Sequence, residues 1–379
     1  MLDEFTRPRV TEGTFDEIFV GQKPILMGVE PNSFCWVVGD FAENRDGPSW
    51  ARHFDGFEHL EHAVTDAGTG LLKGLSLSNE RRQQAGREPI AHSLDVFHTK
   101  YEGNRAWRVT ESRVWKAQKK ADDLWRPLEK RRQQGKSIRS KTHAAHAAHA
   151  ASRRAERLLE EAIQIETAWK HVCSALEWFT PEGELNTSEA AREKLNTWLP
   201  FLKGDTWEKT VRMLQRTESL TFLDRIAKQL EALSLDEQDR RDTLRLEAIR
   251  RRPSLLAGDN SHCRALRAWH LVVSLRMARD ESFRLAVEMV HNLFRKCWRA
   301  SSLVEGINSV VRMQQARHRK LTAGLIDLKR FYWNCRRFRT GRRKNCSPYE
   351  LLGIQLPIDD WWQLLKIDPD KLRKQLSGQ

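Results

Sequence analysis

The sequence lacks any apolar run long enough to span a bilayer, and its first residues, MLDEFTRPRV, lack the apolar core of a signal peptide. Its six cysteines are scattered and none belongs to a CxxC pair, which argues against a zinc site or a disulfide framework. Acidic residues are outnumbered, with 51 Asp and Glu against 65 Lys and Arg. We therefore expect a soluble, cytoplasmic protein with reduced thiols and no membrane partner.

The formal net charge of +14 favours an anionic partner, and nucleic acid is the commonest such partner. Basic residues are concentrated near the end of the chain, where twelve Lys and Arg stand against the single acid Asp327 between Arg312 and Lys344. Lys and Arg neutralise phosphates with little regard for base sequence. We therefore predict that this stretch binds DNA through Arg312, Arg317, Arg319, Lys320, Arg336, Arg337, Arg339, Arg342, Arg343 and Lys344.

Four aromatic residues, Phe331, Tyr332, Trp333 and Phe338, are interleaved with these charges. Such rings can stack on the bases of a frayed DNA end, or they can anchor a helix on the protein core while the arginines face outwards. The sequence leaves both alternatives open.

The first hundred residues have the pattern of a sheet. Short runs rich in β-branched and aromatic residues at 14–22, 23–30 and 33–41 are separated by turn residues, which predicts a three-stranded antiparallel meander. Residues 60–66 and 91–100 are two further strand candidates with a helix between them. Because a strand–helix–strand order favours a mixed α/β sheet, we predict a mixed five-stranded α/β core with flanking helices.

The middle of the chain has a helical pattern. From Leu158 to Phe179, apolar residues recur at alternating steps of four and three, which predicts a long helix with residues 107–134 as its antiparallel partner. Too few strand-like runs occur here to extend the sheet, so we predict a large all-α insertion. The predicted domains are the first part of the core (1–102), the insertion (103–298), a helix and basic stretch (299–355) and a short tail (356–379).

Three acids are candidates for a metal site: Asp16 in the first strand, Asp66 at the end of the fourth, and Glu305 in a helix far downstream. Crowded carboxylates raise each other's pKa, and a divalent cation removes this conflict. Mg²⁺ prefers oxygen ligands, and two such ions can promote in-line displacement at phosphorus. On the helix, Arg312 shares a polar face with Glu305 and is placed to grip a phosphate.

Four segments of the sequence together resemble a bacterial insertion-sequence transposase of the DDE class. They are DEIFVGQKPILMGVEPNSFCWVVGDFAENRDGPSW, VTDAGTGLLKGL, DVFHTKYEG, and the long stretch from SSLVEGINSVVRMQQ to NCSPYELLGI. The resemblance implies an RNase H-like catalytic core that is interrupted by a helical insertion before the last acid. It implies that Asp16, Asp66 and Glu305 are catalytic and bind Mg²⁺ or Mn²⁺.

The same resemblance implies metal-dependent cleavage and strand transfer of an insertion sequence. The partners would be transposon ends and target DNA, with a homodimer or larger assembly on DNA, and the protein would be associated with the bacterial nucleoid. Transposases of this kind carry a helix-turn-helix module ahead of the core. Only fifteen residues precede Asp16, so we expect this chain to lack that module. A truncated, non-catalytic DNA-binding remnant and a nuclease that cuts without joining are the alternatives.

The assignment of the acids leaves alternatives. Asp40 and Asp46 compete with Asp16, which we prefer because the implied fold places the first acid on its first strand. Asp95 also ends a strand candidate and is the rival of Asp66 as second acid. His98 follows three residues later, and it either shapes the site without binding metal or is a structural histidine held by a hydrogen bond.

Overall fold

The computed structural model describes residues 2–137, 141–317 and 321–377. The chain divides into two units. The first comprises Met1–His98, Asp224–Ser234 and Glu288–Gln379, and the second comprises Thr99–Leu223 and Leu235–Val287. The division into four domains that the sequence predicts differs from this division into two units and stays a prediction.

The first unit contains a mixed five-stranded sheet in the order β3-β2-β1-β4-β5. Its strands are β1 (Glu12–Val20), β2 (Lys23–Glu30), β3 (Cys35–Phe41), β4 (His62–Thr65) and β5 (Ala91–Leu94). The first three strands form an antiparallel meander, β4 pairs in parallel with β1, and β5 pairs in parallel with β4. The predicted mixed five-stranded α/β sheet is thus confirmed.

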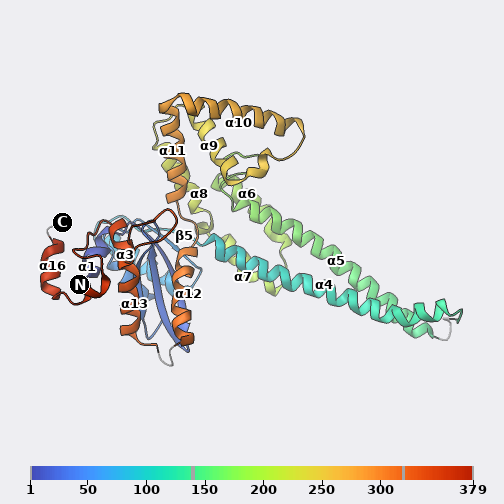
Figure 1. The fold of residues 1–379 in the computed structure, drawn as a ribbon. Coiled ribbons are helices and arrows are strands. Elements are labelled where there is room, and N and C mark those ends of the chain that lie inside the picture. Colours follow the sequence, from blue (N-terminus) through green and yellow to red (C-terminus); the bar gives the residue numbers. More distant parts are fainter. Residues whose placement is uncertain (1, 138–140, 318–320, 378–379) are drawn as a thin grey trace. The chain divides into compact units, whose positions relative to one another are not determined.

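Side chains of β1 alternate between two apolar layers, as the period of a strand requires. Phe15 packs into the layer that includes Trp50 of α2 (Gly47–Asp55) and Leu71 of α3 (Thr69–Gln84). Ile18 packs into the other layer, with α12 (Ser302–Arg317) and α13 (Ala323–Cys335). Figure 1 shows α12 and α13 running along the sheet. Asp16 therefore faces the same side as Ile18, toward α12.

Two details of the sheet differ from the prediction. The fifth strand, predicted over residues 91–100, ends at Leu94, and α4 (Val96–Gln133) begins two residues later. The reason is local, because the Asp95 carboxylate accepts a hydrogen bond from the backbone N–H of His98 (3.0 Å) and so starts the helix. The short helix α2 was not predicted, although Asp46 caps it by accepting a hydrogen bond from the Ser49 N–H (2.9 Å).

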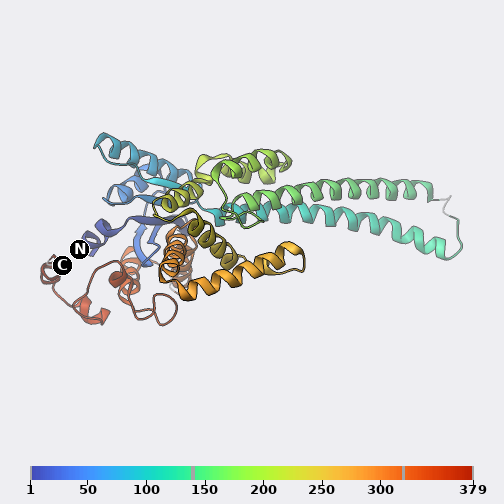
Figure 2. The same cartoon turned by 90° about the horizontal axis from the view of Figure 1, so that it is seen from above.

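The second unit is built on the predicted helix pair. Helix α5 (Thr142–Ala175) runs antiparallel to α4, as Figure 2 shows. Trp125 donates a hydrogen bond to Ser152 (2.8 Å) and Trp169 donates one to Asn104 (3.0 Å), which fixes that direction. The other helices that lie wholly in this unit are α6 (Ser188–Trp198), α7 (Asp205–Gln215), α9 (Glu237–Arg251) and α10 (Ser261–Arg279). The residues of α8 (Thr221–Glu231) and α11 (Glu281–Lys296) are divided between the two units.

Short helices complete the ends of the chain: α1 (Leu2–Thr6), α14 (Pro348–Leu351), α15 (Trp361–Leu365) and α16 (Pro369–Ser377). Helix α14 begins with a capping box, in which Ser347 and Glu350 bond each other's backbone N–H groups. Among the residues that the structure describes, none of the helices combines the length and the apolar character that crossing a membrane would require.

Candidate metal centre

Asp16 is a buried carboxylate on β1, with 6% of the residue exposed. Its Oδ1 accepts a hydrogen bond from the Glu17 N–H (2.8 Å) and its Oδ2 accepts one from the amide of Asn308 (2.8 Å). The second bond joins residues 292 positions apart in the sequence and ties β1 to α12. The surroundings of Asp16 are therefore set by the packing of α12 on the sheet.

Two more aspartates follow the neighbouring parallel strands at matching positions. Phe15 is in register with Thr65, and Thr65 is in register with Leu94. The next residues along the three strands are Asp16, Asp66 and Asp95, so these acids form a row across the carboxyl ends of β4 and β5. Carboxyl ends of parallel strands are a usual place for functional groups.

Asp66 is half-buried in the middle of this row. Its Oδ1 accepts a hydrogen bond from the Gly68 N–H (2.8 Å). A Cβ on Gly68 would lie 2.7 Å from that oxygen, and a Cβ on Gly70 would lie 1.7 Å from the carbonyl oxygen of Arg45. The glycines of the AGTG motif therefore allow the close turn that follows the acid.

Helix α12 brings Glu305 to the same place. Its apolar residues Val304, Ile307 and Val311 are buried against the sheet. Glu305 stands on the adjoining face, with 32% of its side chain exposed, and lies 3.5 Å from the guanidinium of Arg312. The predicted helical face is thus present, but Arg312 pairs with Glu305 instead of standing apart from it.

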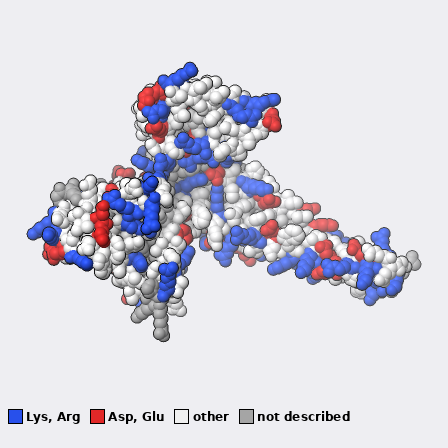
Figure 3. Space-filling model, viewed as in Figure 1, with Lys and Arg blue, Asp and Glu red and all other residues white. Residues whose placement is uncertain are grey.

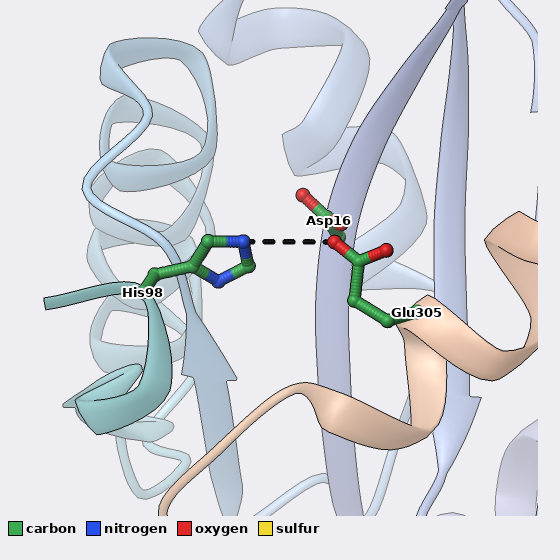
Figure 4. A group of neighbouring side chains, drawn as sticks. All are labelled: Asp16, His98 and Glu305. Atoms are coloured by element: carbon green, nitrogen blue, oxygen red, sulfur yellow. Dashed lines mark ion pairs between the residues drawn. The ribbon is translucent and has the colours of Figure 1, made fainter. Parts of the chain in front are cut away.

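His98 lies in the first turn of α4 and is held by Asp95. The Asp95 carboxylate lies 2.9 Å from Nδ1 of the imidazole, and it also accepts hydrogen bonds from the backbone N–H (2.7 Å) and the hydroxyl of Ser301. Nε2 of the imidazole lies 3.7 Å from the Glu305 carboxylate. Figure 4 shows the ring directed toward Glu305, with Asp16 beside that carboxylate.

Asp16, His98 and Glu305 form a group that can hold a metal ion. One ligand atom of each lies within 4.8 Å of the others. The donor set of two carboxylates and one imidazole suits a divalent cation. The Oδ1 atom of Asn308 is buried at the same place without a hydrogen-bond partner among the described residues, which is the kind of orphan that an ion or its bound water satisfies.

The electrostatics of the group are those of crowded acids around one cation. Burial raises the pKa of Asp16 to about 6, and the charges of Asp66 and Glu305 raise it as well, while the Glu17 N–H and His98 oppose the change. Burial lowers the pKa of His98, but its hydrogen bond to Asp95 and its ion pair with Glu305 outweigh burial and raise that pKa to about 10. Without an ion, protonated His98 is therefore the cation that the acids share.

The pKa values of the two carboxylates beside the imidazole, Glu305 and Asp95, are lowered. The contact with the His98 side chain is the main cause that lowers the pKa of Glu305, and Arg312 adds to it. Burial raises the pKa of Asp95, but its hydrogen bonds and the charge of His98 prevail, so that its pKa is lowered. Both groups are therefore held in the ionised state that a metal site needs.

The predicted acids have different places in this arrangement. Asp16 and Glu305 come together, and Asp66 stands next to Asp16 in the row without belonging to the ligand group. The alternatives for the first acid lie elsewhere: Asp40 pairs with His53 (3.0 Å), and Asp46 caps α2. Asn308, three residues after Glu305 on α12, was not among the predicted site residues.

The predicted DNA-binding residues differ in their surroundings. Arg317, Arg339 and Lys344 are exposed, and Arg312 is exposed while it pairs with Glu305. Others are engaged within the first unit: Arg336 lies over Trp333 (3.7 Å), Arg337 pairs with Glu350 and with Asp359 (2.9 Å), Arg342 lies over Trp298 (5.0 Å), and Arg343 donates to the carbonyls of Pro31 (2.6 Å) and Asn32 (2.9 Å). Arg319 and Lys320 lie outside the described residues.

The interleaved aromatic residues anchor the helix. Trp333 is buried in the layer between α13 and the sheet, and Phe331 packs on the opposite apolar layer. Phe338 stacks on Phe34, and Tyr332 meets the ring of Trp361 edge-on. Of the two alternatives left open by the sequence, docking on the protein core therefore describes these rings.

No protein-family model, no curated protein and no solved structure matches this chain.

Proposed function

We propose that the chain is a DDE-type transposase that cleaves and joins DNA strands in a metal-dependent reaction. The observation that supports this most is the meeting of Asp16 and Glu305, which come from distant parts of the sequence, within one ligand group. Asp66 extends the group because it follows β4 directly beside Asp16. Such a cluster of acids has no evident use in stabilising the fold, since burial raises the pKa of Asp16 and makes its charge unfavourable.

The sheet supports the finer fold proposal, an RNase H-like core. A mixed five-stranded sheet with the first acid on its first strand is the arrangement that the sequence resemblance implies. The last acid lies on a helix that packs across that strand, after the long helical segment. These features come from separate parts of the chain and agree with a single catalytic core.

A divalent ion at this site would activate an attacking water or 3′-hydroxyl and stabilise the leaving oxygen at a DNA phosphate. Asp16 and Glu305 would hold that ion, and Asp66 would serve a second ion or a bound water. Asn308 keeps the Asp16 carboxylate in place through its amide. Arg312, with more than half of its side chain exposed beside Glu305, would contact the phosphate being cut.

The distribution of charge agrees with a DNA substrate. On the face seen in Figure 3, Lys and Arg side chains occur along the α4/α5 pair, interspersed with Asp and Glu. In the second unit, a groove between these two helices has a volume of about 610 Å³ and is lined by Arg113, Lys116, Lys120 and Arg154 together with alanines and leucines. Such basic surfaces bind the phosphate backbone and make affinity depend on salt.

The test is cleavage and joining of DNA by the full chain. Purified protein is incubated with supercoiled plasmid and labelled DNA ends in the presence of Mg²⁺, Mn²⁺ or Ca²⁺. We expect nicking and strand transfer with Mg²⁺ or Mn²⁺, and loss of both in Asp16→Asn, Asp66→Asn and Glu305→Gln. DNA binding by these variants, measured by fluorescence anisotropy, should stay near the wild-type level.

A matched control is Glu43→Gln, because Glu43 is an exposed acid of the first unit outside the site. It should cleave like the wild type. Salt-sensitive DNA binding without any metal-dependent nicking would refute the proposal and favour a non-catalytic remnant. Nicking without joining would refute the transferase part and favour a nuclease.

A further inference from the structure

We propose that His98 is itself a metal ligand, so that the centre binds a transition-metal ion such as Mn²⁺ through one nitrogen and two carboxylate oxygens. The inference deepens the proposed function and rests on it in one respect, because it requires that Asp16 and Glu305 bind an ion. It goes beyond the set of three acids, in which all the protein ligands are oxygens.

The orientation of the imidazole supports this role. Asp95 takes the Nδ1 side of the ring at 2.9 Å, which leaves Nε2 on the side of Glu305 and Asp16. An ion that binds there would displace the Nε2 proton to solvent. Asp95 is fully buried and is also bonded by the backbone N–H of Ser301, so it cannot easily turn away. In metal sites, a histidine that binds the ion through one ring nitrogen usually donates a hydrogen bond from the other nitrogen to a carboxylate.

The spacing of the donor atoms points the same way. Nε2 of His98 and the Glu305 carboxylate are 3.7 Å apart, which is longer than a hydrogen bond of 2.7–3.2 Å. Two ligands of one ion, each about 2.1 Å from it, are separated by roughly 3.0–3.4 Å at tetrahedral or octahedral angles. A small movement of the Glu305 side chain, which is one-third exposed, would close the remaining difference.

Asn308 supplies an independent sign of a bound group. The residue is fully buried, and its Nδ2 donates to Asp16. Its Oδ1 lies on the same amide and has no hydrogen-bond partner among the described residues. A water bound to an ion between Asp16 and Glu305 would donate a hydrogen bond to this oxygen.

The nitrogen ligand determines which ions the centre favours. Imidazole suits transition metals, whereas Mg²⁺ prefers oxygen ligands. A centre with His98 as a ligand should therefore bind Mn²⁺ or Co²⁺ more tightly than Mg²⁺. Without that ligand, the centre should prefer Mn²⁺ or Co²⁺ over Mg²⁺ by a smaller factor.

The experiment is pulsed electron paramagnetic resonance of the full chain with one equivalent of Mn²⁺, without DNA. We expect modulation from a directly bound ¹⁴N in the wild type. His98→Gln should lose it and bind Mn²⁺ at least about tenfold more weakly, with a smaller loss for Mg²⁺. His53→Gln is the matched control, because His53 also pairs with an aspartate but lies outside the group, and it should keep the nitrogen signal.

Asp95→Asn tests the positioning role of that residue. It should keep Mn²⁺ bound but weaken its affinity about 10–100-fold, as expected for loss of a supporting carboxylate. Mn²⁺ that binds and supports DNA cleavage without ¹⁴N modulation would overturn this inference and leave the proposed function standing. Absence of Mn²⁺ binding in the wild type would overturn both, and persistence of the nitrogen signal in His98→Gln would overturn the assignment of His98.

Discussion

Replacing Asp16 by Asn should make the metal-free protein more stable, which is the reverse of the usual effect of changing a buried residue. The carboxylate is buried beside other acids, and its pKa is raised from 3.8 to about 6. Asn has nearly the same shape and no charge. Its carbonyl can accept the bond from the Glu17 N–H, and its amide can donate to Asn308 Oδ1 once that side chain is flipped, which keeps the bond between the two residues.

The size of the effect follows from proton linkage. Each pKa unit is worth about 1.4 kcal/mol, so ionising Asp16 in the folded protein costs about 3 kcal/mol at pH 8. The pKa of Asp16 is higher in the folded protein than in the unfolded chain. The stability that protonated Asp16 contributes is therefore fully present below pH 3.8 and is lost as the pH rises through about 6. Asp16→Asn should therefore be stabilising by about 3 kcal/mol at pH 8 and by about half as much at pH 5.

Hydrogen exchange of the β1 and β2 amides measures this stability, because these strands lie at the centre of the first unit. Wild type and variant are compared at each pH in EDTA. Mn²⁺ at about 100 times its Kd should stabilise the wild type by about 2.7 kcal/mol and leave the variant unchanged. The reasoning would be refuted if Asp16→Asn were no more stable than the wild type at pH 8, or if its gain did not depend on pH.

Three further predictions concern the rest of the chain. Gly103→Ala places a Cβ 2.0 Å from a buried tryptophan ring of α5, so the usual gain of about 1 kcal/mol for alanine in a helix interior should become a net loss of about 1–2 kcal/mol in urea unfolding. Gly324→Ala, in the first turn of α13 and with nothing within 4 Å, is the control and should not be destabilising. Burial holds the pKa of His62 well below 6.5, so the unfolded chain takes up a proton first and stability should fall as pH drops below 6.5; His62→Asn should flatten that part of the pH–stability curve. Arg339→Ala should reduce the salt dependence of DNA binding by about one charge without changing the melting temperature. Arg343→Ala should lower the free energy of unfolding by about 1–3 kcal/mol, because two backbone carbonyls lose their donor.

The strands of the sheet could be predicted from the sequence because each alternates or is continuously apolar over a short run between turn residues. The long helix pair could be predicted because its seam recurs at helical spacing. The end of the fifth strand was placed too late, because the start of α4 depends on a single hydrogen bond between the Asp95 carboxylate and a backbone N–H. Such a cap is hard to distinguish from a strand end in one sequence.

The site was predictable only in part, for a similar reason. Asp16 and Glu305 could be named from residue type and from the resemblance to a transposase. The roles of Asn308 and Ser301 depend on contacts between segments about 200–300 residues apart, and no local pattern indicates such contacts. The place of His98 depends on the tight turn at Asp95 between β5 and the first turn of α4, so its membership of the ligand group could be seen only in the structure.

The central claim is that Asp16 and Glu305 bind one divalent ion. Anomalous diffraction from crystals of the full chain grown with Mn²⁺ tests it most directly. We expect an anomalous peak about 2.0–2.3 Å from a carboxylate oxygen of each residue, and no peak there in crystals of Asp16→Asn. A wild-type map without a peak between these two side chains, or with its only strong peak elsewhere on the chain, would contradict the account.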